Sequence, residues 1–110
     1  MIYDNVASCI GNTPLVRLSR VFAEKNVTVL AKMELMNPGG SIKDRPAKYM
    51  LEMGIQAGTI NHDSHIIESS SGNLAIALAM TCKLKGPDIT AAVATTITPS
   101  TTQTVRRSGR

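Results

Sequence analysis

Short β-branched segments alternate along this chain with longer segments whose apolar residues recur at helical spacing. A first strand is expected at residues 27–33, and the sequence Asn-Pro-Gly-Gly at residues 37–40 is typical of a turn. A helix should follow, because the next apolar residues recur on one face of a helix. The side chains expected to face the core from this helix are Ile42, Pro46, Tyr49, Met50 and Met53.

The same alternation continues to the end of the chain. A second strand is expected at residues 65–68, a helix rich in Ala and Leu at 72–85, and a third strand at 89–94. Thr98 and Pro99 could start a third helix over residues 99–107. The resulting βαβαβα order predicts the α/β class, with a parallel sheet and right-handed crossovers.

A sheet of three parallel strands is narrow, because such sheets usually continue and carry helices on both faces. We therefore expect residues 1–110 to be a fragment of a larger fold. The length of 110 residues fits one small domain and excludes a two-domain enzyme. The 43% of hydrophobic and 18% of charged residues exclude a disordered chain.

The net charge of +4 depends on three arginines among the last five residues. A cluster at a chain end is a weaker sign of nucleic-acid binding than a basic face or groove. Aromatic residues make up only 3% of the chain, too few for a base-stacking surface. We expect no nucleic acid among the partners.

Nothing in the sequence predicts secretion or a membrane span. Asp4 stands where a signal peptide would need positive charge, and the longest apolar run, residues 74–80, falls far short of the ~20 residues that cross a bilayer. Cys9 and Cys82 are far apart and form no C-x-x-C motif, so neither a disulfide scaffold nor a zinc site is expected. These features predict a cytoplasmic protein without a membrane partner and without a metal.

Two Gly-containing loops each open a predicted helix. The loop Ser70-Ser71-Gly72-Asn73 would present backbone N–H groups to an anion such as a carboxylate or phosphate. The alternative is an ordinary helix start, because Ser, Gly and Asn are common there. The segment His62-Asp63-Ser64-His65 is interpreted as a polar turn in preference to a metal site, and Met33, Met36, Met50, Met53 and Met80 as core residues.

Lys43 lies in the other loop, where the chain passes from Gly39-Gly40 into a helix. Ser41 and Asp44 resemble a capping box, but Pro46 conflicts with a start at Ser41, so we expect the helix to begin near Arg45. The Lys43 amine could face a crevice beside the sheet and act as a nucleophile. The alternative is a solvated surface charge.

Three motifs together resemble those of the pyridoxal-phosphate enzymes of the cysteine synthase and tryptophan synthase β-chain family. They are Gly-Asn-Thr-Pro-Leu at residues 11–15, Asn-Pro-Gly-Gly-Ser-Ile-Lys-Asp-Arg at 37–45, and Ser-Ser-Gly-Asn at 70–73. The motifs occur in the family's order, and the similarity covers essentially the whole chain. Within the family, residues 37–50 and 69–80 are most similar to the branch that makes precursors of 2,3-diaminopropionate, with cysteine synthase next.

The resemblance implies a role for each site residue. Lys43 would hold pyridoxal 5'-phosphate and move the α-proton of an amino-acid substrate. Asn73 would hydrogen-bond the cofactor's phenolic oxygen, while Ser70, Ser71 and Gly72 would hold the substrate carboxylate. The family fold has two α/β domains, of which this chain would supply the N-terminal part, and the full-length form would be a homodimer. The expected reaction is β-replacement on an activated serine of the O-phosphoserine or O-acetylserine class.

The chain departs from the family pattern at two positions. Leu74 and Ala75 stand where the family has Thr and Gly, and Leu74 fits the diaminopropionate branch better than cysteine synthase. The family's glycine-rich phosphate loop lies downstream of the residues present here. The alternative is therefore a non-catalytic fragment or small interaction module that does not bind the cofactor stably.

Overall fold

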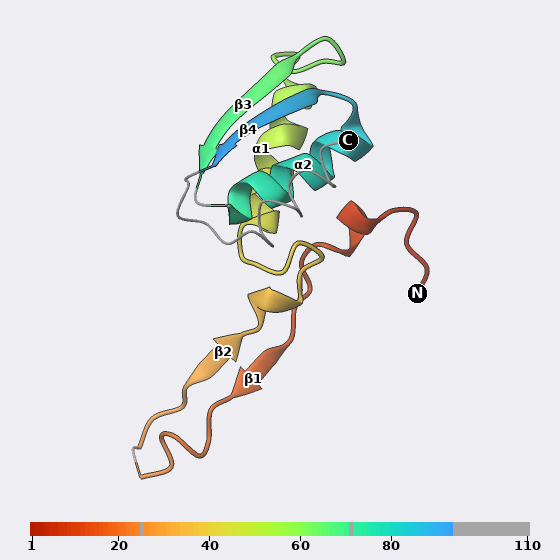
Figure 1. Ribbon diagram of the computed structural model, residues 1–110. Coiled ribbons are helices and arrows are strands. Elements are labelled where there is room, and N and C mark those ends of the chain that lie inside the picture. Colours follow the sequence, from red (N-terminus) through yellow and green to blue (C-terminus); the bar gives the residue numbers. More distant parts are fainter. Residues whose placement is uncertain (25, 71, 94–110) are drawn as a thin grey trace.

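The computed structural model describes residues 1–24, 26–70 and 72–93 (Figure 1). The elements in chain order are the 3-10 helix η1 (Val6–Cys9), strands β1 (Leu15–Arg17) and β2 (Leu30–Lys32), the 3-10 helix η2 (Glu34–Met36), helix α1 (Asp44–Gln56), strand β3 (His65–Ser70), helix α2 (Asn73–Lys85) and strand β4 (Asp88–Val93). The helix predicted at residues 99–107 lies outside the described residues, as does the last residue predicted for the third strand, Ala94.

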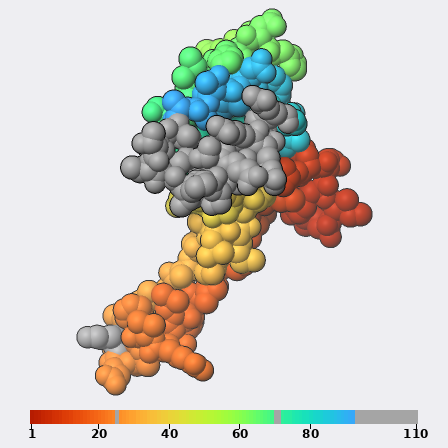
Figure 2. Space-filling model, in the orientation of Figure 1, coloured from red at the N-terminus to blue at the C-terminus, as the bar shows by residue number. Residues whose placement is uncertain are grey.

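Strands β1 and β2 form an antiparallel hairpin that projects from the rest of the molecule (Figures 1 and 2). Leu15 pairs with Lys32 and Arg17 with Leu30. The radius of gyration is 16.6 Å, against about 13 Å for a compact domain of this length.

The predicted first strand exists in a shorter form, as β2, but it pairs with β1 and does not join the parallel sheet. Sequence reasoning missed β1 because its three residues are too few to show a period.

Strands β3 and β4 pair in parallel, from His65 opposite Asp88 to Ser70 opposite Val93. Helix α2 connects the two strands and packs against both of them as well as against α1. This β3–α2–β4 unit confirms the predicted α/β class and the predicted parallel pairing. The strands alternate in exposure, since Ile66 and Ile89 are half-buried while Ile67 and Thr90 are exposed.

Small residues bring α1 and α2 close together. The buried side chains of α2 are Ala75, Ala77, Leu78, Ala79, Thr81 and Cys82, and those of α1 are Asp44, Ala47 and Leu51. The Thr81 hydroxyl donates to the carbonyl of Ala77 at 2.8 Å, so its burial leaves no unpaired donor. The core is therefore built on alanine contacts, with few large side chains.

The predicted core face of α1 is wrong. Tyr49 and Met50 are 67% and 50% exposed, and the other three residues of that face, Ile42, Pro46 and Met53, are also exposed. The helix instead turns toward α2 the face that carries Ala47 and Leu51, because only small side chains allow the two backbones to approach closely. The core role predicted for Met50 and Met53 is wrong for the same reason, and the core role predicted for Met36 is wrong because this residue of η2 is exposed.

The helix ends follow the turn residues of the sequence. Helix α1 begins at Asp44, one residue before the predicted start, and Pro46 occupies its first turn, where a missing N–H costs no hydrogen bond. Helix α2 begins after Gly72, whose φ angle is +129°, and is followed by Gly86, whose φ angle is +108°. Both angles favour glycine. No helix within the described residues is long and apolar enough to cross a membrane.

Leu51→Ala should destabilise the chain by about 2 to 5 kcal/mol, because Leu51 is fully buried between the helices and its loss leaves a cavity. Met50→Ala, one position along the same helix, should cost much less, because half of that side chain is already exposed. Urea unfolding followed by circular dichroism measures both. Equal losses in the two variants would contradict the observed orientation of α1.

Candidate functional site

Lys43 is the last residue before α1, and its side chain is exposed. Its N–H donates to the Ser41 hydroxyl at 3.1 Å, and its carbonyl accepts the N–H of Ala47 at 3.1 Å. The backbone of Lys43 is thus fixed on both sides. Within residues 1–24, 26–70 and 72–93 the ion pairs join Arg45 to Glu34 and Lys85 to Glu52, so the Lys43 amine is held by neither.

The N-terminus of α2 and the start of α1, which Lys43 directly precedes, lie at the same end of the α/β unit, where β3 and β4 end (Figure 1). Asn73 is exposed in the first turn of α2, and the carbonyl of Gly72 accepts the N–H of Ile76 at 2.9 Å. The first turn of α2 contains no acidic residue. An anion near this helix end would therefore meet the positive end of the helix dipole without a repelling carboxylate in that turn.

Glu34 accepts hydrogen bonds from three residues, of which Thr13 is distant in the sequence while Asn37 and Arg45 belong to one motif. Arg45 donates to it through Nε at 2.6 Å and through Nη2 at 2.9 Å, the Thr13 hydroxyl donates at 2.5 Å, and the Asn37 amide at 3.0 Å. Arg45 Nη2 also donates to the Thr13 hydroxyl at 3.1 Å. We call Thr13, Glu34, Asn37 and Arg45 the Glu34 network.

The network fixes the ends of the loop that leads to Lys43. The Asn37 amide also donates to the carbonyls of Glu34 and Ser41, and its oxygen accepts the N–H of Gly11 at 2.9 Å. Asn37 and Thr13 are both buried. Lys32 donates to the carbonyl of Thr13 at 2.6 Å. The segment at residues 11–14 is therefore attached to the loop at residues 37–45 by side-chain hydrogen bonds.

Charged hydrogen bonds shift the pKa values within this network. The Arg45 hydrogen bond, supported by those from Thr13 and Asn37, lowers the pKa of Glu34 from 4.5 to about 2, against a smaller opposing effect of burial. Glu34 in turn raises the pKa of Arg45. Both side chains therefore stay charged at neutral pH.

Asp44 is fully buried, directly after the exposed Lys43. Its Oδ2 accepts the N–H of Gly39 at 2.5 Å, whereas Oδ1 has no hydrogen-bond partner among the described residues. A Cβ atom on Gly39 would collide with this carboxylate, so only glycine fits there. Burial raises the pKa of Asp44, with the Gly39 N–H opposing and the charge of Glu34 adding to the effect. The predicted capping box is absent, because Asp44 binds the loop and not the helix end.

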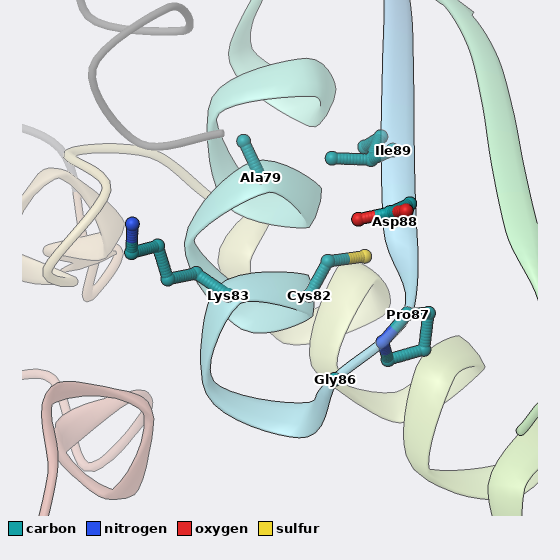
Figure 3. A pocket seen from close by; sticks show the side chains of 7 residues that line it. All are labelled: Ala79, Cys82, Lys83, Gly86, Pro87, Asp88 and Ile89. Carbon is teal, nitrogen blue, oxygen red and sulfur yellow. The ribbon is translucent and has the colours of Figure 1, made fainter. Parts of the chain in front are cut away.

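A hollow of about 330 Å³ lies at the opposite end of the unit, between the last turns of α2 and the start of β4. The Cys82 sulfur points toward β4, whereas Lys83 points away from it (Figure 3). Burial raises the pKa of the Cys82 thiol to about 11, so this thiol is a poor nucleophile at neutral pH. We assign no chemistry to this hollow.

The histidine segment forms a polar turn, as the sequence predicts. Asn61 and Ser64 hydrogen-bond each other across the turn, and Asp63 donates its N–H to the Asn61 side chain at 2.8 Å. His65 lies outside the turn, at the start of β3, where its Nε2 lies 2.7 Å from the hydroxyl of Thr90 on the neighbouring strand. No group of three His, Cys, Asp or Glu side chains suited to a metal occurs in the part of the chain that the structure describes.

The structure brings Lys43 and Asn73, from two separate motifs, to one end of the α/β unit. Ser71 lies outside the described residues, and for Ser70 only the backbone is described, as the last residue of β3. The carboxylate site at residues 70–73 thus stays a prediction. Sequence reasoning missed Glu34, because the fold brings Thr13 and Arg45 to it from 21 and 11 residues away, with no sequence period.

The residues at this end fit a cofactor that carries an aldehyde and a substrate that carries a carboxylate. Lys43 offers an exposed primary amine, which an aldehyde requires for covalent attachment. Helix α2 offers an N-terminus that favours an anion. Ala75, which departs from the family pattern, is fully buried, so its methyl group is accommodated in the core and does not stand in the site.

Comparison with known proteins gives the same family from sequence and from structure. The family described as "Pyridoxal-phosphate dependent enzyme" matches residues 6–110. The chain is 52% identical over 106 residues to N-(2-amino-2-carboxyethyl)-L-glutamate synthase of Ralstonia nicotianae, which covers 96% of this chain and 31% of that protein. The chain spans about a third of the length of the curated relatives it matches.

Two solved structures show how closely the fold is shared. The O-acetylserine dependent cystathionine beta-synthase of Helicobacter pylori superposes with a TM-score of 0.90 at 30% identity and covers 99% of this chain and 36% of its own. An O-ureido-L-serine synthase superposes with a TM-score of 0.88 at 34% identity and covers 99% of this chain and 34% of its own. The described arrangement is thus similar to the corresponding third of these enzymes.

Glu34 should make stability depend on pH between about 5 and 2. The pKa of Glu34 is about 2 in the folded chain and ordinarily 4.5, so on acidification the unfolded chain takes up a proton at Glu34 at a higher pH than the folded chain does. The stability of the folded chain therefore falls as the pH falls. Glu34→Gln should be less stable than the parent above pH 5, with the difference closing toward pH 2. Urea midpoints at several pH values measure it.

Glu52→Gln is the control, because it removes a carboxylate from an exposed pair with Lys85 outside the network. It should keep the parent's fall with pH. Asp44 acts in the opposite direction, since its raised pKa makes this carboxyl oppose folding as the pH rises above its ordinary value of 3.8. A constant difference between parent and Glu34→Gln from pH 7 to pH 2 would contradict the assignment to Glu34.

Proposed function

Because the chain belongs to the family of pyridoxal-phosphate dependent enzymes, we propose that Lys43 is the residue that holds the cofactor. The observation that supports this proposal is geometric. The Lys43 amine is exposed and outside the described ion pairs, while the two residues that follow it are held by Gly39 and Glu34. The Lys43 amine is thus available for reaction with an aldehyde.

Each residue at this end would have a distinct role. Bound pyridoxal phosphate supplies the electron sink that chemistry at the α-carbon of an amino acid requires. The Lys43 amine, once released by the incoming substrate, would take the proton from the α-carbon as general base. Asn73 would donate a hydrogen bond to the cofactor's phenolic oxygen, and the backbone at Ser70, Ser71 and Gly72 would hold the substrate carboxylate at the N-terminus of α2.

We propose β-replacement on an activated serine as the reaction of the polypeptide that contains the rest of the fold. The bond from the β-carbon to the phosphate or acetate oxygen breaks, the leaving group departs as its anion, and a new C–N or C–S bond forms to an amine or to sulfide. The proton that Lys43 takes from the α-carbon is returned to it after the new bond forms, and the proton lost by the nucleophile is released with the departing anion. Leu74 and the 52% identity support an amine as the nucleophile, as the name of the Ralstonia relative indicates for that protein.

Membership of the family supports further features of this assignment. Small-molecule amino acids would be the substrates, the cytoplasm would be the location, and the full-length form would be a homodimer.

The large side chains exposed on α1, among them Tyr49 and Met50, are the observation that favours a second candidate function. That candidate is a non-catalytic fragment or interaction module that binds another surface through its apolar residues.

Incubation with pyridoxal phosphate followed by borohydride reduction should place the label on Lys43. Lys43→Arg should abolish this label, because a guanidinium keeps the charge but cannot form the reducible bond. Peptide mapping by mass spectrometry locates the modified lysine. Lys48→Arg, on the same helix, is the matched control and should keep the label at Lys43. Labelling spread over several lysines and unchanged in Lys43→Arg would overturn the assignment and support the non-catalytic candidate.

A further inference from the structure

We propose that Thr13 is a positioning residue for Lys43, and that the Gly-Asn-Thr-Pro-Leu segment at residues 11–15 serves to hold the loop that presents this lysine. The inference rests on the role proposed for Lys43. Thr13 carries no chemistry that the reaction uses, and it does not precede Lys43 closely in the sequence. Thr13 is far from the Lys43 loop in the sequence and lies next to it only in the folded chain.

The Thr13 side chain is placed to act through Glu34 and Arg45. Its hydroxyl donates to Glu34 Oε1 at 2.5 Å and accepts from Arg45 Nη2 at 3.1 Å, so both its donor and an acceptor site are used. Thr13 is buried, with an exposed fraction of 6%. Arg45 is two residues beyond Lys43, in the first turn of α1, so the bonds of its guanidinium restrain the helix start that directly follows Lys43.

The loop before Lys43 needs such a restraint. It contains Gly39 and Gly40, and Gly40 has a φ angle of +82° with open space where a Cβ atom would be. Glycine loses more conformational freedom on ordering than any other residue, so the loop is intrinsically mobile. The bonds that oppose this mobility come from the Glu34 network and from Asp44.

A second contact from the same segment supports the inference. Gly11 donates its N–H to the Asn37 side chain at 2.9 Å, and Asn37 donates in turn to the carbonyl of Ser41 at 3.0 Å. Residues 11–13 therefore reach the loop on both sides, at Asn37 before Lys43 and at Arg45 after it. A segment that only stabilised the hairpin would not need contacts at both places.

The test compares Thr13→Val, which keeps the shape and loses the hydroxyl, with Thr13→Ser, which keeps the hydroxyl. The first readout is hydrogen exchange of the Gly39 and Gly40 amides in the chain without cofactor. The second readout is the share of pyridoxal-phosphate label found at Lys43 after borohydride reduction. Thr59→Val is the matched control, because the Thr59 hydroxyl bonds only the Gly54 carbonyl among the contacts described for it, in an exposed turn.

Thr13→Val should speed exchange at Gly39 and Gly40 by about fivefold and lower the share of label at Lys43 by a similar factor, while amides in the middle of α2 exchange as in the parent. Thr13→Ser should restore both values, and Thr59→Val should change neither. Equal acceleration in the loop and in α2 would show a general loss of stability and overturn the inference. Unchanged exchange in Thr13→Val would also overturn it.

The two readouts separate this inference from the proposed function. If the parent chain shows no selective label at Lys43 but Thr13→Val still speeds loop exchange, the positioning of the loop stands and the cofactor role fails. If the parent is labelled selectively and Thr13→Val alters neither readout, the cofactor role stands and the positioning inference fails.

Discussion

The carboxylate of Glu34 organises the polar part of this structure. It accepts hydrogen bonds from Thr13, in the first motif, and from Asn37 and Arg45, at the two ends of the second motif. An ion pair with two bonds between guanidinium and carboxylate sets direction as well as distance, which a lysine at position 45 could not do. Without this carboxylate the Thr13 hydroxyl, the Arg45 side chain and the Asn37 amide would lose their shared acceptor, and the two motifs would keep only the Gly11–Asn37 and Thr13–Arg45 bonds between them.

The apolar part of the structure depends on a different constraint, the close contact of α1 with α2. Ala47 of α1 and Ala77 of α2 are fully buried in one cluster, and their small side chains let the helix backbones approach. The same contact leaves the larger side chains of α1, such as Tyr49 and Met50, on the outside. Burial of large apolar side chains usually stabilises a domain more than burial of alanine does. The large apolar side chains that α1 leaves exposed therefore do not add to the stability of the folded chain as they would if they were buried.

The sequence was sufficient for the elements whose determinants are local. Helix α2 ends at Gly86 as predicted, and β3 and β4 appear where the β-branched residues lie. It was insufficient for β1, for the pairing of β2 and for the buried face of α1. Each of these depends on which surface a segment meets, and the larger apolar stripe of α1 was outweighed by the fit of Ala47 and Leu51 against α2. The site was predicted at Lys43, but the residues that hold its loop were not, because their spacing follows no period.

The direction of Lys43 follows from its neighbours. In the first turn of a helix, successive side chains are rotated by about 100° from one another. Asp44 is turned into the protein by its bond to Gly39, and Arg45 is turned toward Glu34. With the next two side chains fixed inward on different sides, the side chain of Lys43 is left to point outward, where it is observed. A lysine at a helix start can thus be exposed while its direction from the backbone is set by the two residues that follow it and not by contacts of its own amine.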